Sequence, residues 1–414
     1  MTAPSPNELA ASLRKLDAGS PLYATEFVDL LLAAARAGGA SDVHLQPTVG
    51  RNEGPSYEVR WRIDGVLQLV GEFPRGSAAD VVSRLKVLAG LLTYRADVPQ
   101  EGRIRSEQGQ PGVEMRVSTF PTLHGERAVV RLFAGESQFH FPQDLGLPEE
   151  IEAALLRLLA ETSGAILITG PAGSGKTTTA YACLREVVRT AEGRRSVVSL
   201  EDPIEVAIAG VSQSQVHPAS GFDLATGLRS LMRQDPEVIL VGEIRDRPTA
   251  ETVFQAALTG HLILSTFHAG GAAGGISRLI DMGIEPYLLR SGVRAMLHQR
   301  LVRRLCECAM PAADGDSFLG LPLVRAQESA GCEACRHTGY RGRLVLAELL
   351  PPLVGELGEA VLSRRDALEL ARLATAAGMT TLFQRACTAI ESGVTDPAEV
   401  RRVLGFAEAA GELA

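Results

Sequence analysis

Residues 170–177 combine glycine, lysine and threonine at a spacing typical of phosphate binding. The sequence GPAGSGKT fits G-x-x-x-x-G-K-T, between the apolar run 165–169 and a helix-like stretch 177–191. Glycines let successive backbone N–H groups point inward, and the helix that follows adds its positive end. Lys176 is expected to contact the β- and γ-phosphates, and the hydroxyl of Thr177 is expected to coordinate Mg²⁺. A glycine-rich turn that binds nothing is the alternative. The predicted ATP-binding residues of this loop are Gly170, Pro171, Ala172, Gly173, Ser174, Gly175, Lys176, Thr177 and Thr178.

Two glutamates end apolar strand-like runs downstream of this loop. Glu201 ends the run 196–202 and Glu243 ends the run 237–243. Hydrolysis needs one acid to hold Mg²⁺ and another to orient the attacking water. In RecA-like ATPases the strand inserted between the phosphate-loop strand and the metal-acid strand carries the water-activating glutamate. On that pattern we predict Glu201 as general base and Glu243 as the metal-site acid, with solvated strand-end carboxylates as the alternative.

His268 also ends an apolar run and is placed to sense a terminal phosphate. His261 begins the same run, and seven residues of strand at about 3.3 Å each separate the two by roughly 23 Å. Both cannot contact one γ-phosphate, so we favour His268 and expect His261 to be a packing or capping residue. Arg116 and Arg131 lie on polar faces of predicted strands, and their sequence context alone marks them as ordinary solvated residues.

Four of the six cysteines cluster in the sequence as two pairs. Cys332 and Cys335 have the spacing of a zinc knuckle, whereas Cys306 and Cys308 are one residue closer than that pattern. We predict structural Zn²⁺ held by these four, with His337 as a substitute ligand if the compressed pair cannot supply two thiolates. Reduced thiols in an irregular excursion are the alternative.

The first third of the chain predicts a smaller α+β domain. A helix closed by glycine (22–39), a strand (41–47), a hairpin centred on Asp64-Gly65, a second helix (79–91) and three more strands follow one another. Glycine and proline in residues 134–148 indicate a hinge. We therefore divide the chain into a flexible arm (1–20), an N-terminal domain (21–133), the hinge and an ATPase domain (149–414).

Beyond the hinge, apolar runs of the buried parallel-strand type alternate with helical stretches, which predicts an open α/β sheet whose ligand lies at the carboxyl ends of its strands. This domain includes the cysteine excursion (305–343) and a helical tail (355–408), in which Asp396-Pro397 is expected to open the last helix.

Composition limits the function further. A net charge of −8 and 5% aromatic residues argue against a broad nucleic-acid surface. No run of 18 apolar residues exists, and residues 1–15 lack the apolar centre of a signal peptide. We therefore expect a cytoplasmic protein with only peripheral membrane contact.

The longer motifs together resemble the secretion ATPase superfamily, specifically the assembly ATPases of type II secretion and type IV pilus systems. The resemblance covers about residues 40–405 and implies a RecA-like P-loop domain behind a smaller PAS-like α+β domain. The tail motif and the cysteine excursion favour assembly members over retraction members. The motifs that carry it are SDVHLQP, RWRIDG, PQEGRI, RVSTFPTLHGERAVVRL, GPAGSGKTTT, LEDPIE, RQDPEVILVGEIRD, TGHLILSTFHAG and GMTTLFQRA.

The resemblance implies a homo-hexamer that hydrolyses ATP to power assembly of pilin-like filaments. It matches Arg116 and Arg131 to arginines that reach the nucleotide, and Arg229 and Arg233 to further site arginines. The implied partners are an inner-membrane platform protein and a cytoplasmic docking protein, the latter because the family's N-terminal docking domain has no counterpart here. Gln46 and Ala269-Gly270 depart from the family pattern. A nucleotide-bound scaffold without turnover and a nucleic-acid translocase of related core remain as alternatives.

Overall fold

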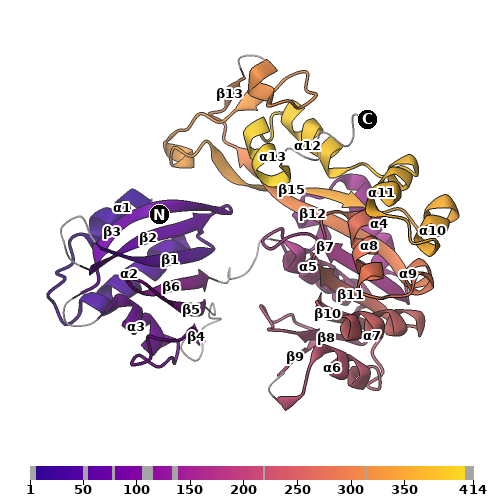
Figure 1. Cartoon of the computed structure of the whole chain (residues 1–414), viewed down its shortest axis with the longest axis horizontal. Coiled ribbons are helices and arrows are strands. Elements are labelled where there is room, and N and C mark those ends of the chain that lie inside the picture. The colour runs from indigo at the N-terminus through magenta and orange to yellow at the C-terminus, as the bar shows by residue number, and fades with distance from the viewer. Residues whose placement is uncertain are drawn as a thin grey trace. The chain divides into compact units, whose positions relative to one another are not determined.

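The computed structural model describes residues 6–49, 55–76, 80–104, 115–132, 139–217, 220–312 and 315–405 (Figure 1). The chain divides into two compact units, Met1–Ser137 and Gln138–Ala414. The predicted hinge 134–148 lies partly outside the described residues, and its later part contains the short 3₁₀ helix η1 (Pro142–Leu145). Among the described residues, no helix is both long and apolar enough to cross a bilayer.

The first unit is built on a six-stranded sheet in the order β3-β2-β1-β6-β5-β4. Every neighbouring pair in it is antiparallel. The predicted hairpin is present, because Asp64 and Gly65 both have positive φ values, 48° and 82°, as a tight turn of two residues requires. The strands are β1 (Asp42–Val49), β2 (Pro55–Ile63), β3 (Val66–Pro74), β4 (Gln100–Ile104), β5 (Met115–Thr122) and β6 (Gly125–Leu132).

Three helices, α1 (Pro6–Leu13), α2 (Tyr23–Ala37) and α3 (Val81–Leu88), bury their apolar stripes in the core of this unit. Leu31 of α2 and Trp61 of β2 are fully buried there. The prediction of a flexible arm over residues 1–20 is wrong for α1, since Leu9 and Leu13 are also buried in this core. Burying two leucines stabilises the helix by about 2 kcal/mol each, which outweighs its weak sequence signal.

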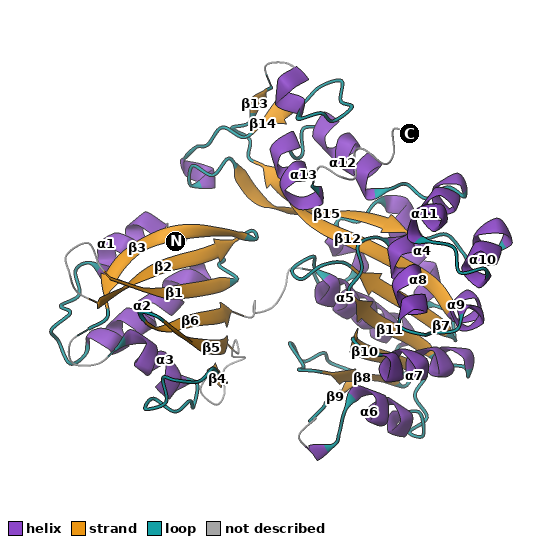
Figure 2. Ribbon diagram, in the orientation of Figure 1, coloured by secondary structure: helices purple, strands orange, loops and turns teal. Residues whose placement is uncertain are grey.

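The second unit is built on a seven-stranded sheet in the order β15-β12-β7-β11-β10-β8-β9 (Figure 2). The strands from β12 to β9 are parallel, and β15 runs antiparallel to β12. The strands are β7 (Gly164–Thr169), β8 (Val197–Glu201), β9 (Ser212–Gln215), β10 (Val238–Ile244), β11 (Leu262–Phe267), β12 (Val293–Leu305) and β15 (Tyr340–Leu349).

Helices cover both faces of this sheet, so alternate residues of one strand enter two different cores. On β7, Leu167 packs with Phe254 of α7, while Ile166 and Ile168 pack with Leu184 of α5. This double burial explains why the strands are apolar runs without alternation. The helices are α4 (Glu149–Leu159), α5 (Lys176–Ala191), α6 (Leu224–Leu231), α7 (Arg247–Leu258), α8 (Ala272–Asp281) and α9 (Pro286–Gly292).

The last part of the chain forms the predicted helical tail. Asp396 caps its last helix, accepting the backbone N–H of Glu399 at 2.8 Å. Before this tail, a small excursion between β12 and β15 contains the short pair β13 (Met310–Pro311) and β14 (Gln327–Glu328) and the 3₁₀ helices η3 (Gly315–Phe318) and η4 (Glu333–Cys335). The tail helices are α10 (Gly355–Leu362), α11 (Ala367–Ala376), α12 (Leu382–Glu391) and α13 (Pro397–Leu404).

Candidate functional site

The phosphate-binding loop, residues 170–175, joins the end of β7 to the start of α5, as the sequence predicts. Gly170 and Gly175 have φ values of 147° and 88°, and a Cβ at Gly170 would lie 2.5 Å from the carbonyl oxygen of Gln299. Lys176 Nζ donates to the carbonyl oxygens of Gly170 at 3.0 Å and Pro171 at 2.9 Å. The ammonium therefore lies inside the loop, beside the N-terminus of α5, where an anion binds.

Two carboxylates act electrostatically on this ammonium. Burial lowers the pKa of Lys176 from its ordinary value, while the negative charges of Glu243 and then Glu205 act to raise it. A nearby carboxylate or phosphate stabilises the charged form of Lys176, so the ammonium keeps its positive charge. A polyphosphate and a bound cation would be held between these opposite charges.

Glu243 lies near the carboxyl end of β10, and its side chain is mostly buried. Its Oε2 accepts from Arg245 Nε at 2.5 Å, and its Oε1 lies 2.8 Å from Nε2 of His268. The hydrogen bond from Arg245 orients the carboxylate, whereas its buried Oε1 makes no hydrogen bond among the described residues. The carboxylate lies at the edge of the sheet where the phosphate loop also lies.

The sheet order corrects one prediction about Glu201. We expected its strand to lie between the phosphate-loop strand and the strand of Glu243, but the strand in that place is β11. Glu201 lies on β8, beyond β10 and three strand spacings from β7, which is roughly 14 Å. Chain order did not predict this because each parallel connection crosses over before its strand joins the sheet.

The contacts of Glu201 also argue against its predicted role as general base. The side chain is buried, and its carboxylate accepts from the hydroxyl of Tyr181, from Ser199 Oγ at 2.5 Å and from Gln213 Nε2 at 3.1 Å. A carboxylate that already accepts three hydrogen bonds in a buried position is poorly placed to take a proton from water.

Glu205 is a carboxylate that the sequence analysis missed. It lies in the connection from β8 to β9, its side chain is exposed, and its charge acts on Lys176. The signal was present in LEDPIE, where a second glutamate follows the first by four residues. The sequence alone favours Glu201 at the strand end, because strand ends at a sheet edge are the usual place for site residues.

Two residues of β12, neither of which the sequence identified, contact the phosphate loop and the residues on either side of it. Gln299, which is buried, donates Nε2 to the carbonyl oxygen of Ser174 at 2.7 Å and accepts from Thr179 Oγ1 at 3.0 Å. Nδ1 of His298 lies 2.9 Å from Thr169 Oγ1, where β7 ends. These contacts connect the neighbouring strand to both ends of the loop.

The buried His298 predicts a loss of stability in acid. Burial and the charges of Arg300 and Lys176 lower its pKa to about 3, so the folded chain does not take up a proton that the unfolded chain binds below about pH 6.5. The free energy of unfolding should therefore fall by up to about 1.4 kcal/mol per pH unit below pH 6.5. Thermal melting from pH 7 to pH 5 should show a shallower decline for His298→Asn, and parallel curves would contradict this.

The two histidines of the β11 segment behave differently. His268, just after β11, contacts Glu243 as described above, on the same edge as the phosphate loop. Nδ1 of His261 lies 3.0 Å from the carbonyl oxygen of Ala256 at the C-terminal end of α7. The expectation that His261 is a capping residue is confirmed, and it lies at the opposite end of the strand from His268.

Arg229 and Arg233 are exposed at the end of α6. Arg229 donates to Thr226 Oγ1 at 3.1 Å, and Arg233 donates to the carbonyl oxygen of Arg229 at 3.1 Å. These contacts lie within their own helical segment, so the nucleotide role that the resemblance implies for them stays a prediction.

Arg116 and Arg131, in the first unit, face each other directly across the β5–β6 pair. Arg116 contacts the carboxylate of Glu101, and Arg131 Nε donates to Asp42 Oδ1 at 3.0 Å. The structure thus brings these two arginines together on one face, each beside a carboxylate, and their contact with nucleotide stays a prediction.

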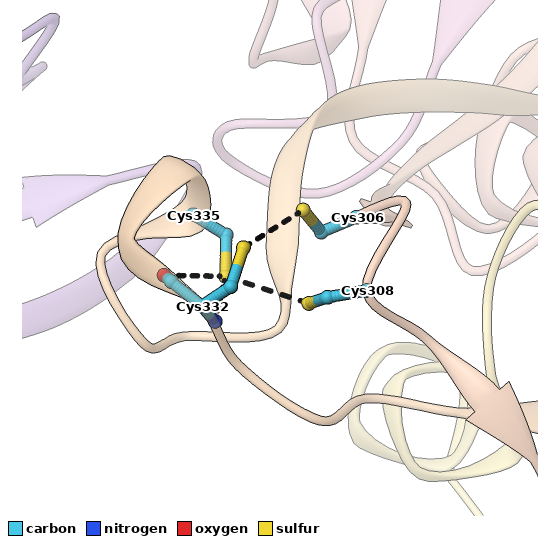
Figure 3. A group of neighbouring side chains, drawn as sticks. All are labelled: Cys306, Cys308, Cys332 and Cys335. Carbon is cyan, nitrogen blue, oxygen red and sulfur yellow. Dashed lines mark hydrogen bonds between the residues drawn. The ribbon is translucent and has the colours of Figure 1, made fainter.

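The four clustered cysteines converge (Figure 3). Their sulfurs all lie within 4.8 Å of one another, with Cys306 and Cys332 at 3.9 Å and Cys308 and Cys335 also at 3.9 Å. Four thiolates around Zn²⁺ at about 2.3 Å would be about 3.8 Å apart. The compressed first pair therefore supplies two sulfurs, and the substitute ligand His337 is not needed in this described group. The donor set fits a tetrahedral zinc ion.

Comparison with known proteins places the chain among secretion proteins. A family model described as "Type II/IV secretion system protein" matches residues 20–402. Type II secretion system protein E of Xanthomonas campestris pv. campestris is 39% identical over 402 residues, covering 95% of this chain and 69% of the relative. Type IV pilus assembly ATPase PilB of Thermus thermophilus is 37% identical over 406 residues, covering 96% of this chain and 44% of the relative. The chain thus spans less than half the length of that pilus relative.

Solved structures confirm the predicted fold. The X-ray structure of the Legionella pneumophila ATPase DotB matches with a TM-score of 0.65 at 20% identity, covering 91% of this chain and 95% of that chain. The chain contains a smaller α+β unit followed in sequence by the α/β sheet, and the cysteine excursion and the helical tail are also present. The motifs, the fold and the family match agree, and the chain belongs to the type II/IV secretion system protein family.

Proposed function

We propose that the chain is a Mg²⁺-dependent ATPase that works as a hexameric motor in type II secretion or type IV pilus assembly. The observation that carries this proposal is the charge arrangement at Lys176, whose ammonium lies inside the phosphate loop under the influence of Glu243 and Glu205. The relatives, a type II secretion system protein E and a type IV pilus assembly ATPase, support the same activity.

The residues present fit Mg²⁺ and ATP. The loop N–H groups and Lys176 hold the phosphates, and the oxygens of Thr177 and Glu243 are the hard ligands that Mg²⁺ prefers, contacting it directly or through water. When bound, Mg²⁺ neutralises the charge that develops on the phosphate oxygens. Arg245 keeps the Glu243 carboxylate in position, and Nε2 of His268 lies 2.8 Å from its Oε1.

Glu205 is the proposed general base, in place of Glu201. It is exposed to water, it follows the buried β8, and its charge acts on the same ammonium that binds the phosphates. Glu201 then has a supporting role through its buried hydrogen bonds. His268 is proposed to sense the terminal phosphate. The family resemblance supports keeping Arg116, Arg131, Arg229 and Arg233 as nucleotide-contacting residues.

The cysteine cluster is proposed to bind one structural Zn²⁺ per chain. All four protein ligands are thiolates in a closed set, which leaves no open position for catalysis. Backbone N–H groups of Gly331 and Gly339 donate to the sulfurs of Cys308 and Cys335, both at 3.3 Å, which stabilises thiolates. The ion would hold the excursion to the ends of β12 and β15.

The assembly is proposed to be a homo-hexamer at the cytoplasmic face of the inner membrane. Its proposed partners are an inner-membrane platform protein and a cytoplasmic docking protein of the secretion or pilus system. The net charge of −8 supports a function without nucleic acid.

Turnover tests this proposal. We expect Glu205→Gln to lower kcat of Mg²⁺-dependent phosphate release by at least about 100-fold while the Kd for ATP changes little, because a general base acts only in the chemical step. Glu201→Gln should lower kcat by less, about 10-fold, and Glu369→Gln, at a partly exposed glutamate on α11 that pairs with Arg372, is the matched control. No turnover in the purified oligomer would favour the scaffold, and stimulation by single-stranded DNA would favour the translocase.

A further inference from the structure

Tyr181 connects the helix of the phosphate loop to the acidic connection after β8. It lies on α5, five residues after Lys176, and only 4% of its surface is exposed. Its hydroxyl donates to Glu201 Oε2 and accepts the backbone N–H of Glu205 at 3.1 Å. One phenol thus contacts both glutamates of the LEDPIE motif, and it uses its only O–H donor to do so.

Glu201 and Gln213 complete a network around the β8–β9 connection. Glu201 Oε1 accepts from Ser199 Oγ at 2.5 Å and from Gln213 Nε2 at 3.1 Å. The same Gln213 amide donates to the carbonyl oxygen of Val206 at 3.1 Å and accepts the backbone N–H of Ile208 at 2.7 Å. The segment 202–208 is therefore held on one side by Tyr181 and on the other by Gln213, and Glu201 joins the two.

The direction of the hydrogen bond from Tyr181 is fixed by its surroundings. Burial and the negative charge of Glu201 raise the pKa of Tyr181 well above its usual value, so the phenol keeps its proton at any physiological pH. The hydroxyl donates its proton to Glu201, and its oxygen accepts a hydrogen bond from the backbone N–H of Glu205. Since buried polar groups without partners are costly, each bond helps keep the others.

We propose that Tyr181, acting with Glu201, is a positioning residue that holds the backbone of Glu205 so that its carboxylate faces the phosphates bound at Lys176. The proposal rests on the proposed role of Glu205 in ATP hydrolysis. Tyr181 and Lys176 lie on one helix, so the residue that holds Glu205 and the residue that binds the phosphates share one rigid element.

Removal of the single hydroxyl tests this inference. Tyr181→Phe should lower kcat by about 10- to 100-fold, since a displacement of about 1 Å at a reacting group costs rates of that order. KM and Kd for ATP should stay within about three-fold, because the loop and Lys176 are untouched. Tyr57→Phe is the matched control, since Tyr57 is also buried and donates to a carboxylate, that of Asp80, but in the first unit.

Two further measurements separate positioning from a general loss of structure. Hydrogen exchange of the amides in 202–208 should speed up by about 10-fold in Tyr181→Phe and not in Tyr57→Phe, because the Glu205 N–H loses its partner. The double variant Tyr181→Phe with Glu205→Gln should be no slower than Glu205→Gln alone, since residues that act as a unit are not additive. Additive losses would overturn the inference.

The failures of the two proposals are distinguishable. If the wild type turns over ATP and Glu205→Gln does not, but Tyr181→Phe keeps its kcat, only the positioning role is wrong. If Tyr181→Phe loses KM rather than kcat, or if Tyr57→Phe loses kcat equally, the positioning role is also wrong. If Glu205→Gln turns over normally, or the wild type shows no turnover, both the proposed base and its positioning fail.

Discussion

Lys176→Ala is expected to lower kcat/KM for ATP by at least about 1000-fold. The lysine is the positive side chain inside the loop, and it donates to two carbonyl oxygens there, so its removal leaves both the phosphates and the loop without this cation. A partly buried charge that contacts transferring phosphates contributes several kcal/mol to transition-state stability, and about 4 kcal/mol corresponds to this factor. Binding should weaken together with turnover.

Lys176→Arg should restore little of this activity, although it keeps the charge. The guanidinium is larger and planar, and it does not fit where a compact ammonium donates to Gly170 and Pro171. Phosphate release and binding of a fluorescent ATP analogue measure both variants. Lys15→Ala, at an exposed lysine of the first unit, is the matched control and should behave as wild type. Wild-type turnover in Lys176→Ala would remove the phosphate loop from the mechanism.

Replacing Cys332 and Cys335 by serine should remove the zinc ion, taking the metal content from about one per chain to none. Serine hydroxyls remain protonated near neutral pH and cannot replace two thiolates. Structural zinc supplies about 10 kcal/mol or more in isolated zinc-finger peptides, so the excursion should lose its fold. Because the cysteines follow β12 and precede β15, we also expect a lower melting temperature for the second unit.

Metal analysis of the purified chain measures this, and limited proteolysis within residues 306–339 reports the local unfolding. Cys387→Ser is the matched control. Cys387 lies on α12, outside the cluster of four cysteines, so this variant should keep its zinc. A chelator should reproduce the double variant in the wild type. A wild-type chain that contains no metal after purification in zinc-supplemented medium would contradict the zinc proposal.

Features that depend on a few adjacent residues could be predicted from the sequence. The phosphate loop, the Asp64-Gly65 hairpin and the Asp396-Pro397 helix start are set by local backbone preferences and caps, and all three are present. Double burial of the parallel strands likewise gives apolar runs that identify them. The convergence of the four cysteines followed from zinc-ligand spacing, even with one pair compressed.

Features that depend on which strands become neighbours could not be predicted from the sequence. A crossover connection lets any later strand join either edge of a growing parallel sheet, and the residues of β8 and β11 do not encode their place beside β10. For that reason our prediction placed the strand of Glu201 beside the phosphate-loop strand, where the structure has β11. The hydrogen bonds of Glu201 and the bracing by Gln299 needed the folded chain.

The sequence by itself determined that this protein has a lysine-bearing phosphate loop, acids at strand ends and four cysteines with ligand spacing. These features are short-range, so backbone preference and residue type are enough to set them. Only the tertiary structure decided which carboxylates act on Lys176 and which one is occupied by other donors. The reason is that electrostatic and hydrogen-bond partners are chosen by distance in space, and the packing of strands and helices sets that distance.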